Sequence, residues 1–238
     1  MRIDLRAVSK GRDGIALPTT TTAFESGRAT LAHAETEQRP TVLGLIASGR
    51  MRPDTGIVML DGRADARGIR RRIALVDAPG ASDPAPNVTT AGVCAEELMF
   101  AGLASGPVAV ARTLRGLGLE HLARVPIADV EPADRLRLLT ELAILRDDVE
   151  GVVLVAPDRH GGDPLDWWTL AKRLADRGFA VLVVAGAAAA AAISAHAMLA
   201  RLRGDEDEPG ADAGLEPELE PALETAIALE LALTGGHA

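Results

Sequence analysis

The chain has 238 residues, with 34 acidic against 25 basic side chains and a formal net charge of −9 at pH 7. Ten of the acidic residues follow Arg203, after which no Lys or Arg occurs, so the rest of the chain is close to neutral. A near-neutral body without a basic stripe among aromatic residues argues against nucleic-acid binding. The single cysteine, Cys94, excludes an internal disulfide and a CxxC metal or redox site.

The longest apolar stretch, residues 179–193, is shorter than the ~20 residues of a membrane-spanning helix and is interrupted by Gly186. We interpret it as a buried strand followed by an alanine-rich helix. The N-terminal MRIDLRAVSK alternates apolar and polar residues, which is typical of a strand and not of a signal peptide. We therefore expect a cytoplasmic protein.

Hydrophobic patterning predicts an alternation of strands and helices along the chain. Strands are expected, in chain order, at residues 2–9 (an edge-type strand), 29–34, 57–62, 73–76, 151–157 and 179–186. Helices are expected at residues 41–49, 90–105, 107–123, 132–145, 164–178 and after Gly186. The basic run Arg67–Arg72 is interpreted as a solvated lead-in to the strand at 73–76, with a contact to an acidic partner or anionic lipid as the alternative. Continuous apolar strands between helices predict an α/β fold with a parallel central sheet, plus a small antiparallel sheet at the start.

Four connecting stretches carry a resemblance to a known family. They are TVLGLIASG (41–49), RPDTGIVMLDG (52–62), NVTTAGVCAEEL (87–98) and GGDPLDWWTLAKRLADRGFAVLVV (161–184). In order and spacing they resemble the ATP-binding cassette domain of ABC transporters over about residues 1–200. The resemblance implies a P-loop NTPase-like domain over residues 1–203 with a helical subdomain at about 88–130. Residues 204–238 are expected to form an acidic linker and an amphipathic tail helix.

The stretch that matches the family's phosphate-binding loop, HAETEQRPT, lacks the glycines and the lysine that cradle phosphates. It holds Glu35 and Glu37, which would repel phosphate, and Pro40, which removes a backbone donor. Arg39 and Thr41 are the only residues that could mimic the lysine and the hydroxyl. A like-charge contact at 4 Å costs ~1 to 4 kcal/mol, so one arginine does not offset both carboxylates and the lost backbone donors.

The other motifs of the family differ in the same way. Ala156 and Pro157 stand where the resemblance places the Asp-Glu pair that serves Mg²⁺ and water, and Asp158 comes two positions late. Glu131 falls in the signature motif, and the Q-loop glutamine aligns with Asp77 or its neighbour. We therefore expect a pseudo-ATPase that binds neither ATP nor Mg²⁺, or only weakly, and has no catalytic or metal residues.

What the resemblance implies for such a chain is a non-catalytic scaffold or regulator in a transporter complex. Its expected partner is a membrane permease or another multi-spanning membrane protein, which would place it at the inner face of the membrane. It could also pair with a second cassette as a homodimer or heterodimer. The residues expected to contact a partner are Val93, Glu96, Glu97, Met99, Phe100 and Trp168. Trp168 follows a core Trp167 and is expected to be partly exposed, with packing in the core or at its edge as its favoured role.

Two alternatives follow from the same residues. An active or half-site ATP-binding subunit would have to rebuild the nucleotide site from Arg39, Thr41, Asp158 and His160. An unrelated α/β enzyme would use the loop DRHGGD, in which Asp158, His160 and Asp163 cluster as a cation site or an acid–base pair. No nucleophile motif supports that enzyme, and the five histidines lack metal-ligand spacing.

Overall fold

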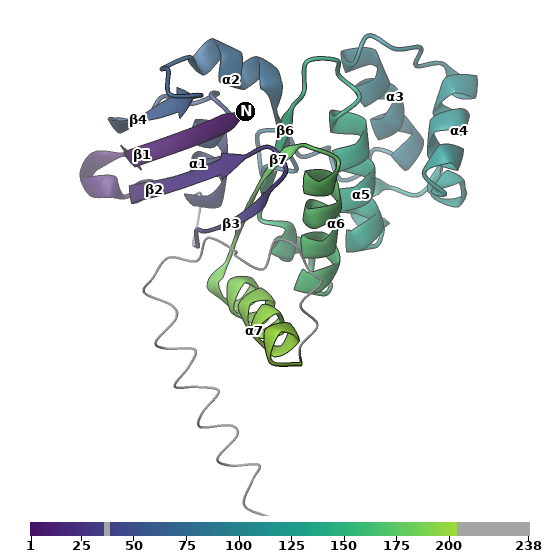
Figure 1. Cartoon of the computed structure of the whole chain (residues 1–238). Coiled ribbons are helices and arrows are strands. Elements are labelled where there is room, and N and C mark those ends of the chain that lie inside the picture. The colour runs from purple at the N-terminus through teal and green to yellow at the C-terminus, as the bar shows by residue number, and fades with distance from the viewer. Residues whose placement is uncertain (36–38, 204–238) are drawn as a thin grey trace, which may run out of the picture.

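The computed structural model describes residues 1–35 and 39–203 (Figure 1). Glu37 and the predicted acidic linker and tail helix lie outside the described residues. The strands are β1 (Arg2–Lys10), β2 (Leu17–Glu25), β3 (Ala29–His33), β4 (Thr55–Leu60), β5 (Ile73–Val76), β6 (Gly151–Val155) and β7 (Ala180–Ala185). The helices are α1 (Arg39–Ala47), α2 (Ala66–Arg72), α3 (Thr90–Phe100), α4 (Pro107–Gly116), α5 (Pro132–Ala143), α6 (Pro164–Asp176) and α7 (Ala187–Arg203).

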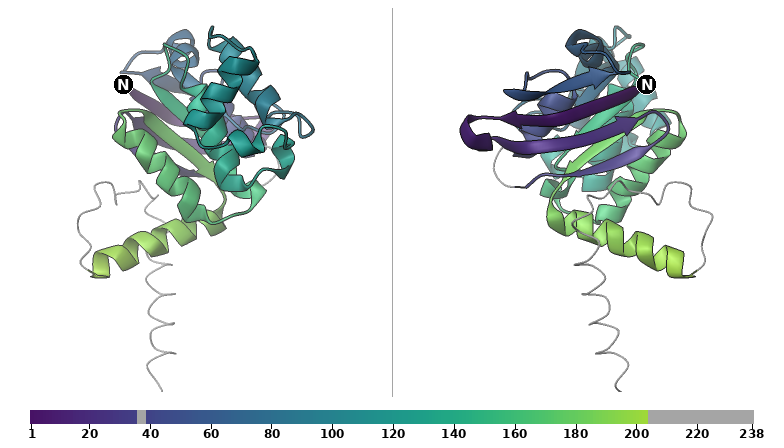
Figure 2. Two further views of the ribbon diagram at one scale, coloured as in Figure 1. Left: turned by 90° about the vertical axis from the view of Figure 1, so that its right-hand side faces the viewer. Right: turned by 60° about the vertical axis from the view of Figure 1, so that its left-hand side comes forward.

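The strands form two sheets. A four-stranded parallel sheet has the order β3-β7-β6-β5, and a three-stranded antiparallel sheet has the order β2-β1-β4. The expected α/β architecture with a parallel central sheet and a small antiparallel N-terminal sheet is confirmed. Figure 2 shows the antiparallel sheet standing as a layer of its own beside the parallel one.

The parallel sheet separates two hydrophobic cores, which explains the uninterrupted apolar runs of its central strands. Along β6, Val152 and Leu154 belong to the core shared with α3–α6, whereas Val153 and Val155 belong to the core shared with α1 and the antiparallel sheet. Successive side chains of a strand point to opposite faces. A strand covered on both faces therefore needs apolar residues at every position, and all five residues of β6 are buried.

Strand β1 is not an edge strand, contrary to the alternation-based expectation. It pairs with β2 on one side and with β4 on the other. Its apolar residues Ile3, Leu5 and Val8 are buried, so the alternation reports a one-sided burial and says nothing about how many neighbours the strand has. Strand β2 lies outside the predicted elements because its sequence, LPTTTTAFE, is rich in threonine and lacks a continuous apolar pattern.

The basic run before β5 forms a helix, α2, which the sequence pattern did not predict; Arg67, Arg70 and Arg71 are exposed, as a solvated lead-in requires. Asp65 caps this helix, because its side chain accepts a hydrogen bond from the backbone N–H of Gly68 at 2.8 Å. Two of its arginines reach carboxylates outside the helix: Arg71 approaches Asp148, and Arg72 approaches Glu150 at 3.4 Å. Helix α7 extends below the two sheets in Figure 2. No helix in residues 1–35 and 39–203 combines the length and hydropathy needed to cross a bilayer.

Candidate functional site at the carboxyl edge of the parallel sheet

The carboxyl ends of the four parallel strands meet at one edge, where open α/β sheets bind their ligands. The turns that follow β3, β5, β6 and β7 bring Glu35, Asp77, Asp158 and Gly186 to this edge. Two of these turns are conformationally unusual. Asp77 has a φ of 57° and Ala156 a φ of 46°, in the left-handed region that non-glycine residues rarely adopt. Such residues concentrate at functional sites.

A buried ionic cluster surrounds Asp77; we call Asp77, Arg135, Arg159 and His160 the Asp77 cluster. The Asp77 carboxylate is fully buried. It accepts a hydrogen bond from Arg135 Nη2 at 2.7 Å, pairs with Arg159 Nη2 at 3.0 Å, and lies 2.8 Å from His160 Nε2. Arg159 also donates to the backbone carbonyl of Asp77. These residues come from β5's end, α5 and the 3₁₀ turn Pro157–His160, so the cluster fastens three separate segments together.

In the cluster the Asp77 carboxylate faces two guanidinium groups. Arg135 is itself buried and donates from Nη1 to the carbonyl of Ile127 at 3.0 Å, which leaves its charge well solvated by protein groups. Burial lowers the pKa of His160 below its ordinary value, and the nearby Asp77 carboxylate opposes that shift. His160 therefore tends toward the neutral form, in which Nε2–H can donate to Asp77.

Two further carboxylates cap the N-terminus of α7. Asp158 Oδ2 accepts a hydrogen bond from the backbone N–H of Gly186 at 2.9 Å, and Glu35 Oε1 accepts from the N–H of Ala187. The first N–H groups of a helix lack partners within the helix and attract anions. Here the chain's own side chains take the place that an external anion, such as a phosphate, would occupy.

The other described residues of the predicted nucleotide site lie at the same edge. Arg39 is the first residue of α1, and Pro40, at its second position, offers no N–H group. Thr41 is half-buried in the first turn. Glu131 immediately precedes α5 but makes no side-chain cap, and Pro157 is buried.

The loop DRHGGD does not bring its three titratable residues together. Asp158 turns to Gly186, His160 turns to Asp77, and Asp163 accepts from the N–H of Leu165 at 2.9 Å to cap α6. In the part of the chain that the structure describes, no three His, Cys, Asp or Glu residues are grouped so as to hold a metal ion. The acid–base or cation site that the loop suggested has no geometric basis.

The predicted partner-binding residues divide by exposure. Glu96, Met99 and Phe100 are exposed at the end of α3, the last two by 58% and 60%. Glu97 is half-buried, and burial raises the pKa of its carboxyl above the ordinary value. Val93, by contrast, packs in the core.

Trp168 is buried as well, so its expected partial exposure was wrong and its favoured role, packing in the core, is confirmed. It packs with Trp167 in the core beneath α6, and neither indole can form part of a docking surface. A Leu and a Val extend the exposed patch beyond Phe100: Leu103 is 47% exposed and Val108, at the start of α4, is 75% exposed.

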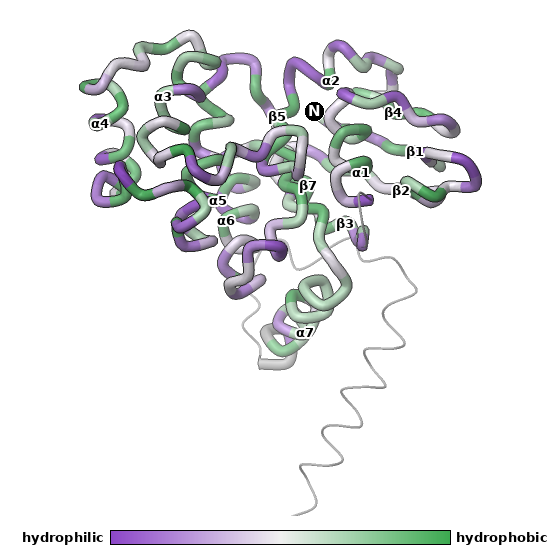
Figure 3. Tube along the Cα trace, turned by 180° about the vertical axis from the view of Figure 1, so that it is seen from behind, coloured by the Kyte–Doolittle hydropathy of each residue, from purple (hydrophilic) through white to green (hydrophobic). Residues whose placement is uncertain are grey.

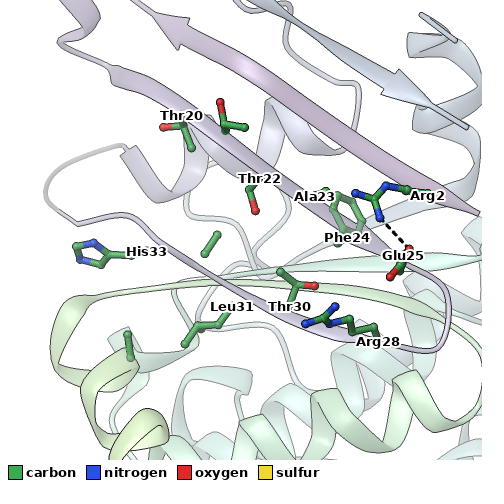
Figure 4. A pocket seen from close by; sticks show the side chains of 13 residues that line it. Arg2, Thr20, Thr22, Ala23, Phe24, Glu25, Arg28, Thr30, Leu31 and His33 are labelled. Carbon is green, nitrogen blue, oxygen red and sulfur yellow. Dashed lines mark hydrogen bonds and ion pairs between the residues drawn. The ribbon is translucent and has the colours of Figure 1, made fainter. Parts of the chain in front are cut away.

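A cavity of about 240 Å³ lies where β2 meets β3 and α7 (Figure 4). Its wall includes Thr20, Thr22 and Thr30, and an ion pair between Arg2 and Glu25 at 3.0 Å spans part of its rim. Strand β3 is at the opposite edge of the parallel sheet from β5, so this cavity and the Asp77 cluster are separate features.

Sequence reasoning missed the two arginines that organise the site. One signal was available: Arg135 lies four residues before Leu139 and seven before Leu142, on the predicted buried face of α5. A buried arginine requires a carboxylate partner. Arg159 had no comparable signal, because it lies in a polar turn.

Among known proteins, no family model and no curated protein matches the chain. Solved structures do. An ATP-binding subunit of an ABC transporter is 20% identical with a TM-score of 0.55, over 80% of this chain and 82% of that one. The dimeric bacterial ABC transporter cassette MJ0796 is 19% identical with a TM-score of 0.58, over 77% and 87% of the two chains.

A third match is cbiO1 from Clostridium perfringens, described as part of the ABC transporter complex cbiONQ. It is 15% identical with a TM-score of 0.55, over 77% of each chain. These likenesses cover 77–80% of this chain at 15–20% identity. The chain therefore has the fold of the ATP-binding cassettes of ABC transporters, as the connecting stretches of its sequence predicted.

Proposed function

We propose that this chain is a cassette-fold subunit that binds a membrane partner and neither binds nor hydrolyses ATP. The observation that carries the proposal is the occupation of the carboxyl edge by the chain's own charged groups. Glu35 and Asp158 hold the N–H groups at the start of α7, and the Asp77 cluster joins the ends of β5 and β6 to α5.

Electrostatics support this reading. A polyphosphate brought to this edge would approach two carboxylates, and each contact at ~4 Å would cost about 1 to 4 kcal/mol. Arg135 and Arg159 are already paired with Asp77, so recruiting them would leave a buried carboxylate without its partners. An active subunit would therefore have to break the ion pairs of Asp77 with Arg135 and Arg159 before these arginines could bind phosphate.

The decisive measurement is calorimetric titration of the purified chain with ATP at millimolar concentration, with and without Mg²⁺. We expect no saturable heat. A micromolar dissociation constant that improves with Mg²⁺ would refute the proposal and favour the active or half-site subunit. The variant Glu35→Gln/Asp158→Asn keeps the shape of the α7 cap and removes its charge, so it tests whether the carboxylates are the obstacle.

For the partner, we propose the exposed apolar patch of Met99, Phe100, Leu103 and Val108. Apolar side chains that gather on a surface mark interaction sites. Here the patch lies beside a cleft of about 140 Å³ that is lined by Phe100, Glu97 and Arg146. The three structural neighbours are named as parts of ABC transporters, which is why we propose an integral membrane protein as the occupant.

A photo-reactive amino acid in place of Met99 tests this surface. The labelled chain is added to membranes of the source cell that have first been washed with carbonate to remove peripheral proteins. We expect a cross-linked product with a multi-spanning membrane protein, lost in Phe100→Glu. The matched control is Ile15→Glu, because Ile15 is an apolar residue 75% exposed in the turn between β1 and β2. Equal cross-linking in the two variants would refute the assignment of the patch.

A further inference from the structure

A second cavity, far from the carboxyl edge, is lined by positive charge. It measures about 610 Å³ and lies between the end of α1, the turn after it, strand β4 and helix α2. Three arginines line it: Arg50, Arg52 and Arg70. Its one acidic wall residue, Asp54, is already engaged by Lys10 Nζ at 2.6 Å and by the N–H of Gly11 at 2.8 Å.

The arginines of this cavity have no carboxylate partner among residues 1–35 and 39–203. Arg50 donates only to the carbonyls of Ser48 and Ile73, each at 3.0 Å. Burial is the main cause that lowers the pKa of Arg50 to about 10, and the charges of Arg146 and Arg70 add to it. Three arginines without a carboxylate partner in the described part of the chain give the cavity a positive field. Such a field attracts an anionic ligand.

The apolar part of the wall restricts the kind of anion that fits. Met51, Ile57 and Val58 line the same cavity, and Ile57 is 43% exposed. Among the described strands, β4 pairs only with β1. On its other edge Leu60 exchanges backbone hydrogen bonds with Arg63, and the part before Leu60 has no strand partner there among the described residues. In Figure 3, α2 and the chain near β4 contain hydrophilic stretches, whereas the central strands are apolar. Arginines beside apolar groups and an open strand edge suit an acidic peptide better than a small inorganic anion.

We propose that the occupant is the acidic segment 205–220 of this same chain. It holds eight acidic residues and no basic one, with Leu215 and Leu219 spaced among the acids. It starts two residues after the end of α7 at Arg203. An extended stretch of this length reaches ~50–60 Å. Half the circumference of a compact body ~43 Å across is ~68 Å, so the segment can reach most of the surface apart from the region directly opposite its start. The segment thus competes, within the same chain, with any acidic partner that would bind the cavity. This property is distinct from the proposed function.

A spin label attached through Ala213→Cys tests the contact in the full chain, because the native Cys94 is buried and does not react. We expect the label to remove more than half of the amide signal intensity of residues 50–58 and 66–70 at ~0.05 M salt. The signals should recover in about 1 M salt, where the screening length falls to ~3 Å.

Charge reversal identifies the groups responsible. The exposed pair Arg52→Glu/Arg70→Glu should abolish the broadening while the rest of the amide spectrum stays folded. The control Arg112→Glu/Arg137→Glu makes the same charge change at two exposed helical positions elsewhere and should retain it. The proposal is overturned if broadening is absent, if it falls on another surface, if it survives Arg52→Glu/Arg70→Glu, or if it arises only between spin-labelled and isotope-labelled copies mixed together.

Discussion

The Asp77 cluster makes a quantitative prediction about stability. In Asp77→Asn the side chain keeps its shape and loses its charge, so Arg135, whose side chain is only 6% exposed, stays buried without a counter-ion. Breaking a buried ion pair by removing one partner costs about 3–5 kcal/mol. The Asn carbonyl can still accept one hydrogen bond from Arg135, so we expect the lower end, about 3 kcal/mol. For a domain of this size that corresponds to a fall in Tm of roughly 6–12 °C.

Thermal unfolding followed by circular dichroism measures the effect. The control is Glu141→Gln, the same kind of change at the more exposed pair with Arg177, where a loss of about 0–1 kcal/mol is expected. Adding Arg135→Met to Asp77→Asn removes the uncompensated charge and should cost less than Arg135→Met costs in the wild-type chain. If Asp77→Asn melts no lower than Glu141→Gln, the cluster does not stabilise the fold and the reasoning fails.

Three further predictions concern backbone strain, pH and thiol reactivity. Gly56→Ala should destabilise the chain more than Gly62→Ala. Both glycines have positive φ, but a Cβ at Gly56 would lie 2.3 Å from the carbonyl oxygen of Ala7, whereas a Cβ at Gly62 would meet nothing within 4 Å. Urea unfolding of the two variants measures the difference in stability. Folding lowers the pKa of His160, so the unfolded chain binds a proton on this imidazole more readily than the folded chain does. The contribution of His160 to the free energy of unfolding should therefore be complete above pH ~6.5 and fall as the pH drops below it. His160→Gln should remove this pH-dependent loss of stability, and an unchanged pH profile in that variant would contradict the assignment. Burial raises the pKa of the Cys94 thiol to about 11, so iodoacetamide should label it only as fast as the chain opens, and rapid labelling at pH 8 would show that Cys94 is accessible in the folded state.

The sequence predicted most of the fold because burial on both faces leaves a direct mark. The run at 151–157 became β6, and the alanine run after Gly186 became α7. The sequence patterns did not predict β2 and α2, because the threonines of β2 and the arginines of α2 show no apolar periodicity. Strand β2 is stabilised by its pairing with β1, and α2 by the cap from Asp65 and by carboxylates distant in the chain.

The candidate site was less predictable, because its contacts join residues that are far apart in the chain. Asp77 meets Arg135 across 58 positions and His160 across 83. The family resemblance placed Glu35 and Asp158 in a degenerate nucleotide site, which stays a prediction; the structure shows both carboxylates at the N-terminus of α7. What those carboxylates contact there depends on where α7 starts, which the arrangement of the strands sets.

The burial of both tryptophans on α6 has a practical consequence for spectroscopy. The chain has two Trp and no Tyr, and both indoles belong to the core between the parallel sheet and α3–α6, whereas the core beneath the antiparallel sheet holds neither. Intrinsic emission excited at 295 nm therefore reports on one half of the molecule, while far-ultraviolet dichroism reports on both. Melting curves that coincide would mean that the two cores unfold as one cooperative unit; curves that separate would reveal that one side of the sheet opens before the other.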